Sequence, residues 1–330
     1  MAVTMAEISK LRAMTQAGLM DCKKALVEAN GDMDAAVEIL RKKGQAVAAK
    51  RADRQAAEGC VLAKCEGSYA AIVALNCETD FVAKNAGFVE MCKTILDAAL
   101  ANKVTSLDQL NAIELDGRTI ADLVIEQGGK TGEKTEIGAF EFVEAPSTSA
   151  YTHFGNKLAT IVGFNQEGVD PEVGKEVAMQ VASMNPVAVD RASVPQSVID
   201  PELAIAIEKT KAEQVQKAVE VALKKAGLNP NHFDSEDHIA SNITKGWITE
   251  EDAAKAHKIM EETAAAKAAS LPEQMIQKIS EGRLNKFFKE QTLMEQEFIM
   301  DNTLTIGTYL EKTSKGLAAV SFKRVNLNAD

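Results

Sequence analysis

Alternation of apolar and other residues around a short turn is the feature that most constrains this fold. Apolar side chains recur at every second position on both sides of Glu66-Gly67-Ser68, a period typical of strands. The two runs predict an antiparallel β-hairpin with the glycine in its turn. The alternating positions are Val61, Ala63 and Cys65 in the first run and Ala71, Val73, Leu75 and Cys77 in the second.

A similar order of elements recurs further along the chain. A helical pattern with one apolar face follows the hairpin, and a strand is expected over 137–143. Strands are expected again over 149–154 and 157–164, joined by a turn at Gly155-Asn156 and followed by a helix over 173–184. The repetition predicts two related α+β subdomains with antiparallel sheets.

The first part of the chain carries the signals of three short helices. Thr4 and Glu7 have the spacing of a capping box, in which each side chain satisfies a free backbone amide of the other residue. Asn30-Gly31 is expected to end the second helix, and Asp32 to cap the third, which should end before Gly44. A helical linker is expected to follow this module.

The region from 201 to 288 is predicted to be helical almost throughout, with breaks at Gly227 and Pro230, and a short helix and a strand are expected in the tail. The chain is therefore assigned to the α+β class. Its expected parts are a three-helix module with its linker (1–54), a first core subdomain (55–145), a second core subdomain (146–200 and 271–302), a helical hairpin insertion (201–270) and a C-terminal module (303–330).

The charge of the chain is unevenly distributed. The formal net charge is −11, yet residues 1–54 carry +3 and the remainder −14. Because nucleic-acid affinity rests largely on Lys and Arg neutralising phosphates, binding of nucleic acid is not expected of this acidic body. No apolar run approaches the roughly 20 residues needed to cross a bilayer. The N-terminus also lacks the pattern of a secretory signal. We therefore expect a cytoplasmic protein without membrane contact.

Patterns that would support catalysis are weak. The five cysteines form no CxxC pair, and carboxylates beside Cys77 oppose its ionisation. The cluster NHFDSEDH (231–238) matches no standard zinc site, so a metal- or thiol-dependent enzyme is kept only as an alternative. Residues 128–132 (GGKTG) lack the spacing of a phosphate-binding loop and are expected to form an ordinary loop. We expect no catalytic residue, metal, cofactor or directly bound nucleotide.

Residues 75–85, LNCETDFVAKN, place large apolar side chains in a polar connection after a strand. The part TDFVAKN resembles the signature of the elongation factor Ts family. LRAMTQAGLMDCKKAL (11–26) resembles the N-terminal motif of the same family. Weaker similarity extends the resemblance over nearly the whole chain, at YTHFGNKLATIVGF (151–164), EGRLNKFF (281–288) and QEFIM (296–300).

Two departures limit what the resemblance implies. Asn156-Lys157 stands where relatives typically carry Gly-Arg, so no role of an arginine is transferred to this position. The helical region between about 205 and 270 is longer than is typical, so coiled-coil or dimerisation contacts of the family are not transferred either. A homodimer is left open.

The resemblance implies a guanine-nucleotide exchange factor that binds GDP-bound elongation factor Tu, a GTPase, and accelerates release of GDP. An N-terminal module similar to a ubiquitin-associated domain would dock on this partner, and a second contact is implied near His153. Phe81 would act as a wedge in a segment that dislocates Mg²⁺ from the GTPase. The implied contact residues are Thr79, Asp80, Phe81 and Val82 in that segment and Arg12, Leu19, Met20 and Lys23 in the module.

Other interpretations of the same residues stay open at this point. Phe81 could be buried in its own subdomain, Leu19 and Met20 could form the core of the module, and His153 could be a satisfied histidine of a strand. At the level of the whole chain, the alternative is a helical scaffold or adaptor without exchange activity.

Overall fold

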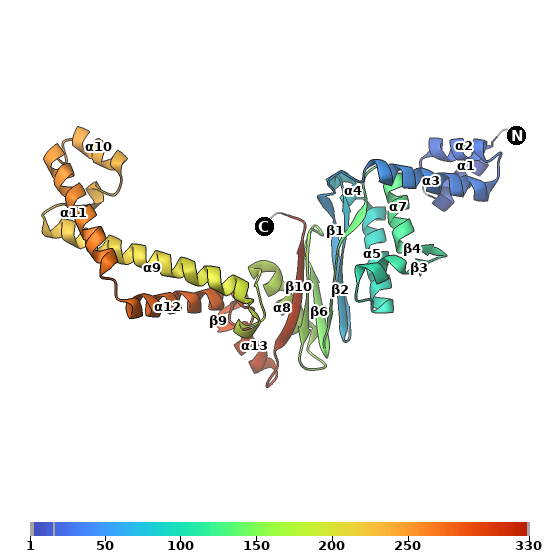
Figure 1. Cartoon of the computed structure of the whole chain (residues 1–330). Helices are drawn as coiled ribbons and strands as arrows, with labels where there is room; N and C mark the ends of the chain where they lie inside the picture. Colours follow the sequence, from blue (N-terminus) through green and yellow to red (C-terminus); the bar gives the residue numbers. More distant parts are fainter. Residues whose placement is uncertain (1–2, 16, 329–330) are drawn as a thin grey trace. The chain divides into compact units, whose positions relative to one another are not determined.

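The structure is a computed structural model that describes residues 3–15 and 17–328. It confirms the α+β class with antiparallel sheets. Contacts divide the chain into two compact units, which are considered separately below (Figure 1). The first unit joins Met1–Val189 with Gln296–Asp330, and the second is Asp190–Glu295.

The three N-terminal helices form as predicted and enclose a small core. Glu7 accepts a hydrogen bond from the Thr4 amide at 2.7 Å, and the Thr4 hydroxyl accepts one from the Glu7 amide at 3.3 Å, which completes the capping box. Asp32 caps the third helix by accepting from the Ala35 amide. The helices are α1 (Met5–Thr15), α2 (Leu19–Glu28) and α3 (Met33–Lys50), and their buried side chains include Ile8, Leu11, Cys22 and Leu26.

The prediction that the third helix ends before Gly44 is wrong. Helix α3 continues through Gly44, which is buried against α7 (Ile120–Thr131). A Cβ atom at Gly129 of α7 would lie only 2.7 Å from the Cα of Gly44, so the two helices cross closely because both residues lack a side chain. Residues 128–132 are likewise not a loop, since they form the last turn of α7 and its left-handed cap at Gly132.

The predicted hairpin lies in a three-stranded antiparallel sheet with the order β1-β2-β5. Cys60 pairs with Leu75 across the hairpin, and Gly67 has the positive φ of 59° that its turn requires. Helix α5 covers one face of this sheet. The bounds are Glu58–Glu66 for β1, Tyr69–Cys77 for β2, Glu136–Glu144 for β5 and Ala86–Asn102 for α5.

Strand β2 is buried on both faces. One set of alternating residues packs in the cluster that includes α5, and the other packs in a second cluster with residues of the second sheet. The sheet is therefore enclosed between a helix and another sheet. The α5 side takes Ala71, Val73, Leu75 and Cys77, and the side of the second sheet takes Ala70, Ile72 and Ala74.

The second sheet has the antiparallel order β10-β7-β6 and is covered on its other face by α8. The buried Thr160 hydroxyl of β7 donates to the Ala178 carbonyl of α8 at 2.7 Å. The tail forms α13 and then β10, the predicted helix and strand, and β10 pairs with β7. The bounds are Ser147–Thr152 (β6), Leu158–Phe164 (β7), Pro171–Met184 (α8), Ile306–Thr313 (α13) and Ala319–Asn326 (β10).

Shorter elements complete the first unit. They are α4 (Asp80–Ala83), α6 (Leu107–Ala112), β3 (Glu114–Leu115), β4 (Arg118–Thr119), β8 (Glu297–Phe298) and β9 (Asp301–Thr305). Within the described residues, no helix combines the length and apolar character that crossing a membrane demands.

The second unit is helical, as predicted. Helix α9 packs along α11 through a cluster that includes Val219, Leu223 and Phe233, and it packs on α12, where Ser280 meets Thr210. The predicted breaks at Gly227 and Pro230 follow the end of α9. The helices are α9 (Gln196–Lys225), α10 (Glu236–Thr244), α11 (Glu250–Ala269) and α12 (Glu273–Gln291), with 3-10 turns at Arg191–Ser193 and Pro230–His232 (Figure 1).

The single tryptophan of the chain belongs to this second unit. Trp247 follows α10 and is 62% exposed. The centre of its ring lies 6.0 Å from that of His232, and the Lys245 ammonium lies 5.0 Å from the ring centre, in a cation–π contact.

The crossing of α3 and α7 predicts different effects for two similar substitutions. Gly129→Ala adds a methyl group that meets the α3 backbone, whereas the new methyl of Gly44→Ala has its nearest neighbour at 3.5 Å. Replacing glycine with alanine in a helix stabilises the fold by about 1 kcal/mol in both variants. Gly129→Ala alone also loses about 1 to 3 kcal/mol of stability through overpacking. We expect amides of α3 to exchange with deuterium faster in Gly129→Ala than in Gly44→Ala. Equal protection would show that the crossing tolerates a side chain.

Candidate partner-binding site

The segment that follows β2 presents one aromatic ring to solvent. Thr79 caps the single turn α4, and its hydroxyl accepts from the Val82 amide at 3.5 Å. Val82 and Ala83 pack on the core of the first sheet, whereas the side chain of Phe81 points outward and is 85% exposed. Burial of this ring in its own subdomain is therefore ruled out.

Asp80 places a negative charge next to the exposed ring. Its carboxylate accepts a hydrogen bond from the Lys84 ammonium at 2.6 Å, one turn further on. This bond holds the pKa of Asp80 below its usual value. The carboxylate is thus ionised at neutral pH, and because the pair is partly exposed, Lys84 can leave it at little cost.

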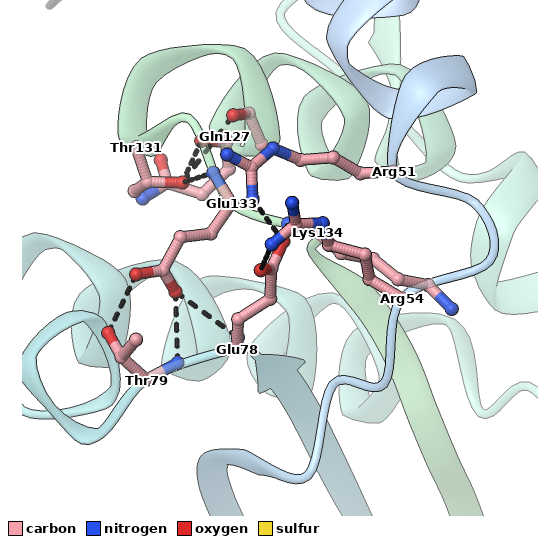
Figure 2. Close-up of polar contacts among 9 residues, drawn as sticks. Arg51, Arg54, Glu78, Thr79, Gln127, Thr131, Glu133 and Lys134 are labelled. Atoms are coloured by element: carbon pink, nitrogen blue, oxygen red, sulfur yellow. Dashed lines mark hydrogen bonds and ion pairs between the residues drawn. The ribbon is translucent and has the colours of Figure 1, made fainter.

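The turn before Phe81 is fastened to the end of α7 by Glu133 (Figure 2). One carboxylate oxygen of Glu133 accepts from the backbone amides of Glu78 at 3.1 Å and Thr79 at 3.0 Å. The other oxygen accepts from the Thr79 hydroxyl at 2.6 Å. One side chain therefore accepts from three donors at the start of this turn.

Glu78 of the turn in turn contacts the residues that follow α7 and α3. Its carboxylate accepts from the Lys134 amide at 2.6 Å, from the Arg51 guanidinium at 2.6 Å and from that of Arg54 at 3.3 Å (Figure 2). The Lys134 amide first, and Arg51 next, lower the pKa of Glu78. The turn is thus tied both to α7 and to the residues that follow α3.

The four implied contact residues of the N-terminal module all lie on its surface. Arg12 of α1 and Lys23 of α2 are exposed, as are Leu19 at 41% and Met20 at 60%. Leu19 and Met20 are therefore not the core of the module. Gln16, within the N-terminal motif, lies outside the described residues.

Val27 joins the exposed surface of α2, although the sequence analysis did not single it out. Leu19, Lys23 and Val27 are spaced by four residues, so they share one face of the helix. That spacing was the signal that could have identified Val27. We call Leu19, Met20, Lys23 and Val27 the α2 surface.

The turn between β6 and β7 holds a second exposed ring. His153 is exposed, with its Nδ1 2.8 Å from the Tyr151 hydroxyl, so it is held but not buried. Phe154, which the sequence analysis also passed over, is 96% exposed. An aromatic residue directly before the predicted Gly155-Asn156 turn was the available signal, since side chains at a hairpin end have little to pack against.

Asn156-Lys157, the departure from the family pattern, is built into this turn. Asn156 has a positive φ of 55°, which asparagine tolerates, and its carbonyl accepts from the Val61 amide at 2.8 Å. Lys157 pairs with Glu58 at the start of β1. Asn156 through its backbone and Lys157 through its side chain therefore both have structural tasks in this protein.

The residues considered for metal or thiol chemistry do not have the arrangement that such chemistry requires. His238 contacts Asp234, and His257 lies 3.7 Å from Glu236, but over 3–15 and 17–328 no three His, Cys, Asp or Glu side chains gather as metal ligands would. Cys77 is buried, and this burial, followed by the charge of Glu133, raises its pKa to about 12.

Comparison with known proteins identifies the family of the chain. The sequence profile of the family described as Elongation factor TS matches residues 78–224 and 209–329. The chain belongs to the elongation factor Ts family. Proteins called Elongation factor Ts from Phocaeicola vulgatus and Bacteroides thetaiotaomicron are each 56% identical to it over 331 residues, and one from Porphyromonas gingivalis is 45% identical. These alignments cover all of both chains, so the long helical region is shared with these elongation factor Ts proteins.

The cysteines provide a test of the site environment. All five are free thiols, and Cys65 alone among them is partly exposed. Because the thiolate is the reactive form, we expect iodoacetamide at pH 8 to modify Cys65 slowly and to leave the buried Cys77 intact in the native protein. Mass spectrometry of the digested protein measures this. Rapid modification of Cys77 would mean that the end of β2 opens readily. The other protected thiols are Cys22, Cys60 and Cys92.

Proposed function

We propose that this protein binds GDP-bound elongation factor Tu in the cytoplasm and accelerates release of GDP, after which GTP binds. The observation that carries the proposal is the ring of Phe81, almost fully exposed on a turn whose backbone is fastened by hydrogen bonds. The chain acts by binding and contributes no covalent chemistry of its own. Membership of the elongation factor Ts family supports the choice of partner.

The proposed mechanism weakens the hold of the GTPase on its nucleotide. A GTPase retains GDP through its phosphate loop and a Mg²⁺ ion that bridges phosphate oxygens and protein ligands. Phe81 would insert between side chains of the partner and shift these elements, while the ionised Asp80 disturbs the ligands and waters of the ion. Thr79 and Val82 would complete the contact at either side of the ring.

Magnitudes show that the ring needs a second contact. Full burial of a phenylalanine contributes about 1.5 to 3 kcal/mol, and each tenfold weakening of GDP binding requires about 1.4 kcal/mol. One ring thus accounts for roughly one to two factors of ten. The α2 surface with Arg12 would supply further binding energy, and His153 a third contact. Since coupling is reciprocal, the GTP that binds next weakens the hold of this protein and releases it.

Removing the ring tests the wedge. We expect Phe81→Ala to fold normally, because the side chain contacts solvent, and to lose most of the acceleration of GDP release. Stopped-flow release of fluorescent GDP from elongation factor Tu is the measurement. Trp247→Ala, which removes another exposed aromatic side chain, is the matched control and should keep the wild-type rate. Near-normal acceleration by Phe81→Ala would refute the wedge.

The α2 surface is tested by a double substitution that spares the core. Leu19→Ala with Met20→Ala should weaken binding to elongation factor Tu by about tenfold or more, equivalent to roughly 1.4 kcal/mol. The rate of GDP release at saturating protein should change little, because Phe81 is untouched. Calorimetry gives the affinity, and Met5→Ala removes an exposed methionine of α1 as the control. Undiminished affinity would reject docking by this surface.

The same measurements separate exchange from a scaffold role. A helical scaffold or adaptor would bind the GTPase and leave the rate of GDP release unchanged. An exchange factor changes that rate in proportion to the complex formed.

A further inference from the structure

The turn that carries Phe81 has little reason to hold its shape by itself. Helix α4 has only four residues, Asp80–Ala83, and a single turn is far too short to be stable in water. Phe81 contributes no packing, because its ring lies in solvent. Val82 and Ala83 pack on the core and hold the second half of the turn. The first half, which carries the exposed ring, must be held by groups outside the turn.

Glu133 is the group best placed to impose it. We infer that Glu133 is a positioning residue that fixes the direction of Phe81 through Thr79, an inference that rests on the exchange function proposed above. Its carboxylate accepts three hydrogen bonds from the turn, two from backbone amides and one from the Thr79 hydroxyl (Figure 2). Glu133 itself follows the left-handed cap of α7 at Gly132 and lies outside the segment that it holds.

The Thr79 hydroxyl transmits the constraint to α4. A hydroxyl group has one hydrogen to donate and lone pairs with which to accept. When the Thr79 hydroxyl donates to Glu133, its lone pairs remain for the Val82 amide, the bond that caps α4. The carboxylate thus selects the side-chain rotamer of Thr79 in which the cap forms, and the cap sets the path of Asp80 and Phe81.

The backbone bonds fix the start of the same turn. Cys77 is the last residue of β2, so the amides of Glu78 and Thr79 lie beyond the ladder of the sheet. Glu133 supplies the acceptor that these two amides would otherwise lack. Glu78 in turn accepts from the amide of Lys134, so each segment holds the backbone of the other with a carboxylate.

Two arginines make this arrangement electrostatically stable. The carboxylates of Glu78 and Glu133 both accept hydrogen bonds where the turn meets the residues after α7. Arg51 and Arg54 contact Glu78 and offset its charge. The three hydrogen bonds that the Glu133 carboxylate accepts all come from the turn.

Loss of the three hydrogen bonds to Glu133 should lower the rate of GDP release more than it weakens binding to the partner. In a loosened turn the Phe81 ring is still present, but it samples many orientations. Only some of these orientations allow the ring to insert into the partner. The α2 surface, which carries the proposed docking energy, does not depend on Glu133. The signature of a positioning residue is therefore a fall in GDP release at saturation with a nearly constant dissociation constant.

The test compares three variants of the full chain. Glu133→Ala should raise deuterium exchange of the amides of residues 78–84 by about tenfold and lower GDP release from saturated elongation factor Tu by about tenfold. Glu133→Gln should restore most of both, because its amide oxygen accepts from the two N–H groups and its NH₂ donates to Thr79. Glu136→Ala is the matched control: it removes a nearby carboxylate that pairs with the Lys134 side chain. Its deuterium exchange over residues 78–84 and its rate of GDP release should equal those of the wild type.

A second variant protects the test against misfolding. Thr79→Val keeps the shape of the side chain and replaces the hydroxyl with a methyl group, so it should loosen α4 in the same direction as Glu133→Ala even if that variant is globally unstable. Far-ultraviolet circular dichroism and the exchange of buried β2 amides identify global unfolding.

Each outcome bears on one of the two proposals. If Glu133→Ala and Thr79→Val keep wild-type protection, or lose it without slowing GDP release, the positioning role is wrong while the exchange function stands. If the wild type itself does not accelerate GDP release, the exchange function fails. The deuterium measurement then still shows whether the hydrogen bonds of Glu133 hold the turn.

Discussion

The burial of β2 on both faces is the constraint on which the rest of the first unit depends. Its apolar side chains are enclosed by α5 on one side and by the second sheet on the other, so the strand has no freedom to slide or tilt without exposing one of the two clusters. Its last residue, Cys77, therefore emerges at a fixed point. Everything proposed for Phe81 begins at that point, because α4 follows after two residues.

Beyond Cys77, polar contacts hold the chain in place of apolar ones. The turn has too few side chains to form a core, and carboxylates from two segments take over by accepting backbone and hydroxyl hydrogens. The continuation of α3 past Gly44 matters here, since it brings Arg51 to Glu78. The residues that follow the N-terminal helices and the turn that carries Phe81 thereby share one electrostatic cluster.

Local signals in the sequence were enough to predict the hairpins, the capping box of α1 and the α+β class, because each depends on residues a few positions apart. Contacts between distant segments were not predictable in this way. The continuation of α3 depends on Gly129, and the role of Glu133 depends on where β2 ends. The second buried face of β2 was hidden because Ala70 and Ala74 give a weak periodic signal. The TDFVAKN segment was found by resemblance, and only the structure shows that its ring faces solvent.

The position of Trp247 gives this protein a natural optical label. It is the single tryptophan, and it belongs to the second unit, next to an imidazole and an ammonium group that influence its excited state. Emission excited at the red edge of its absorption comes from the helical unit alone, while the tyrosines, Tyr69, Tyr151 and Tyr309, all lie in the first unit. Unfolding of the two units can therefore be followed in one cuvette without any added dye.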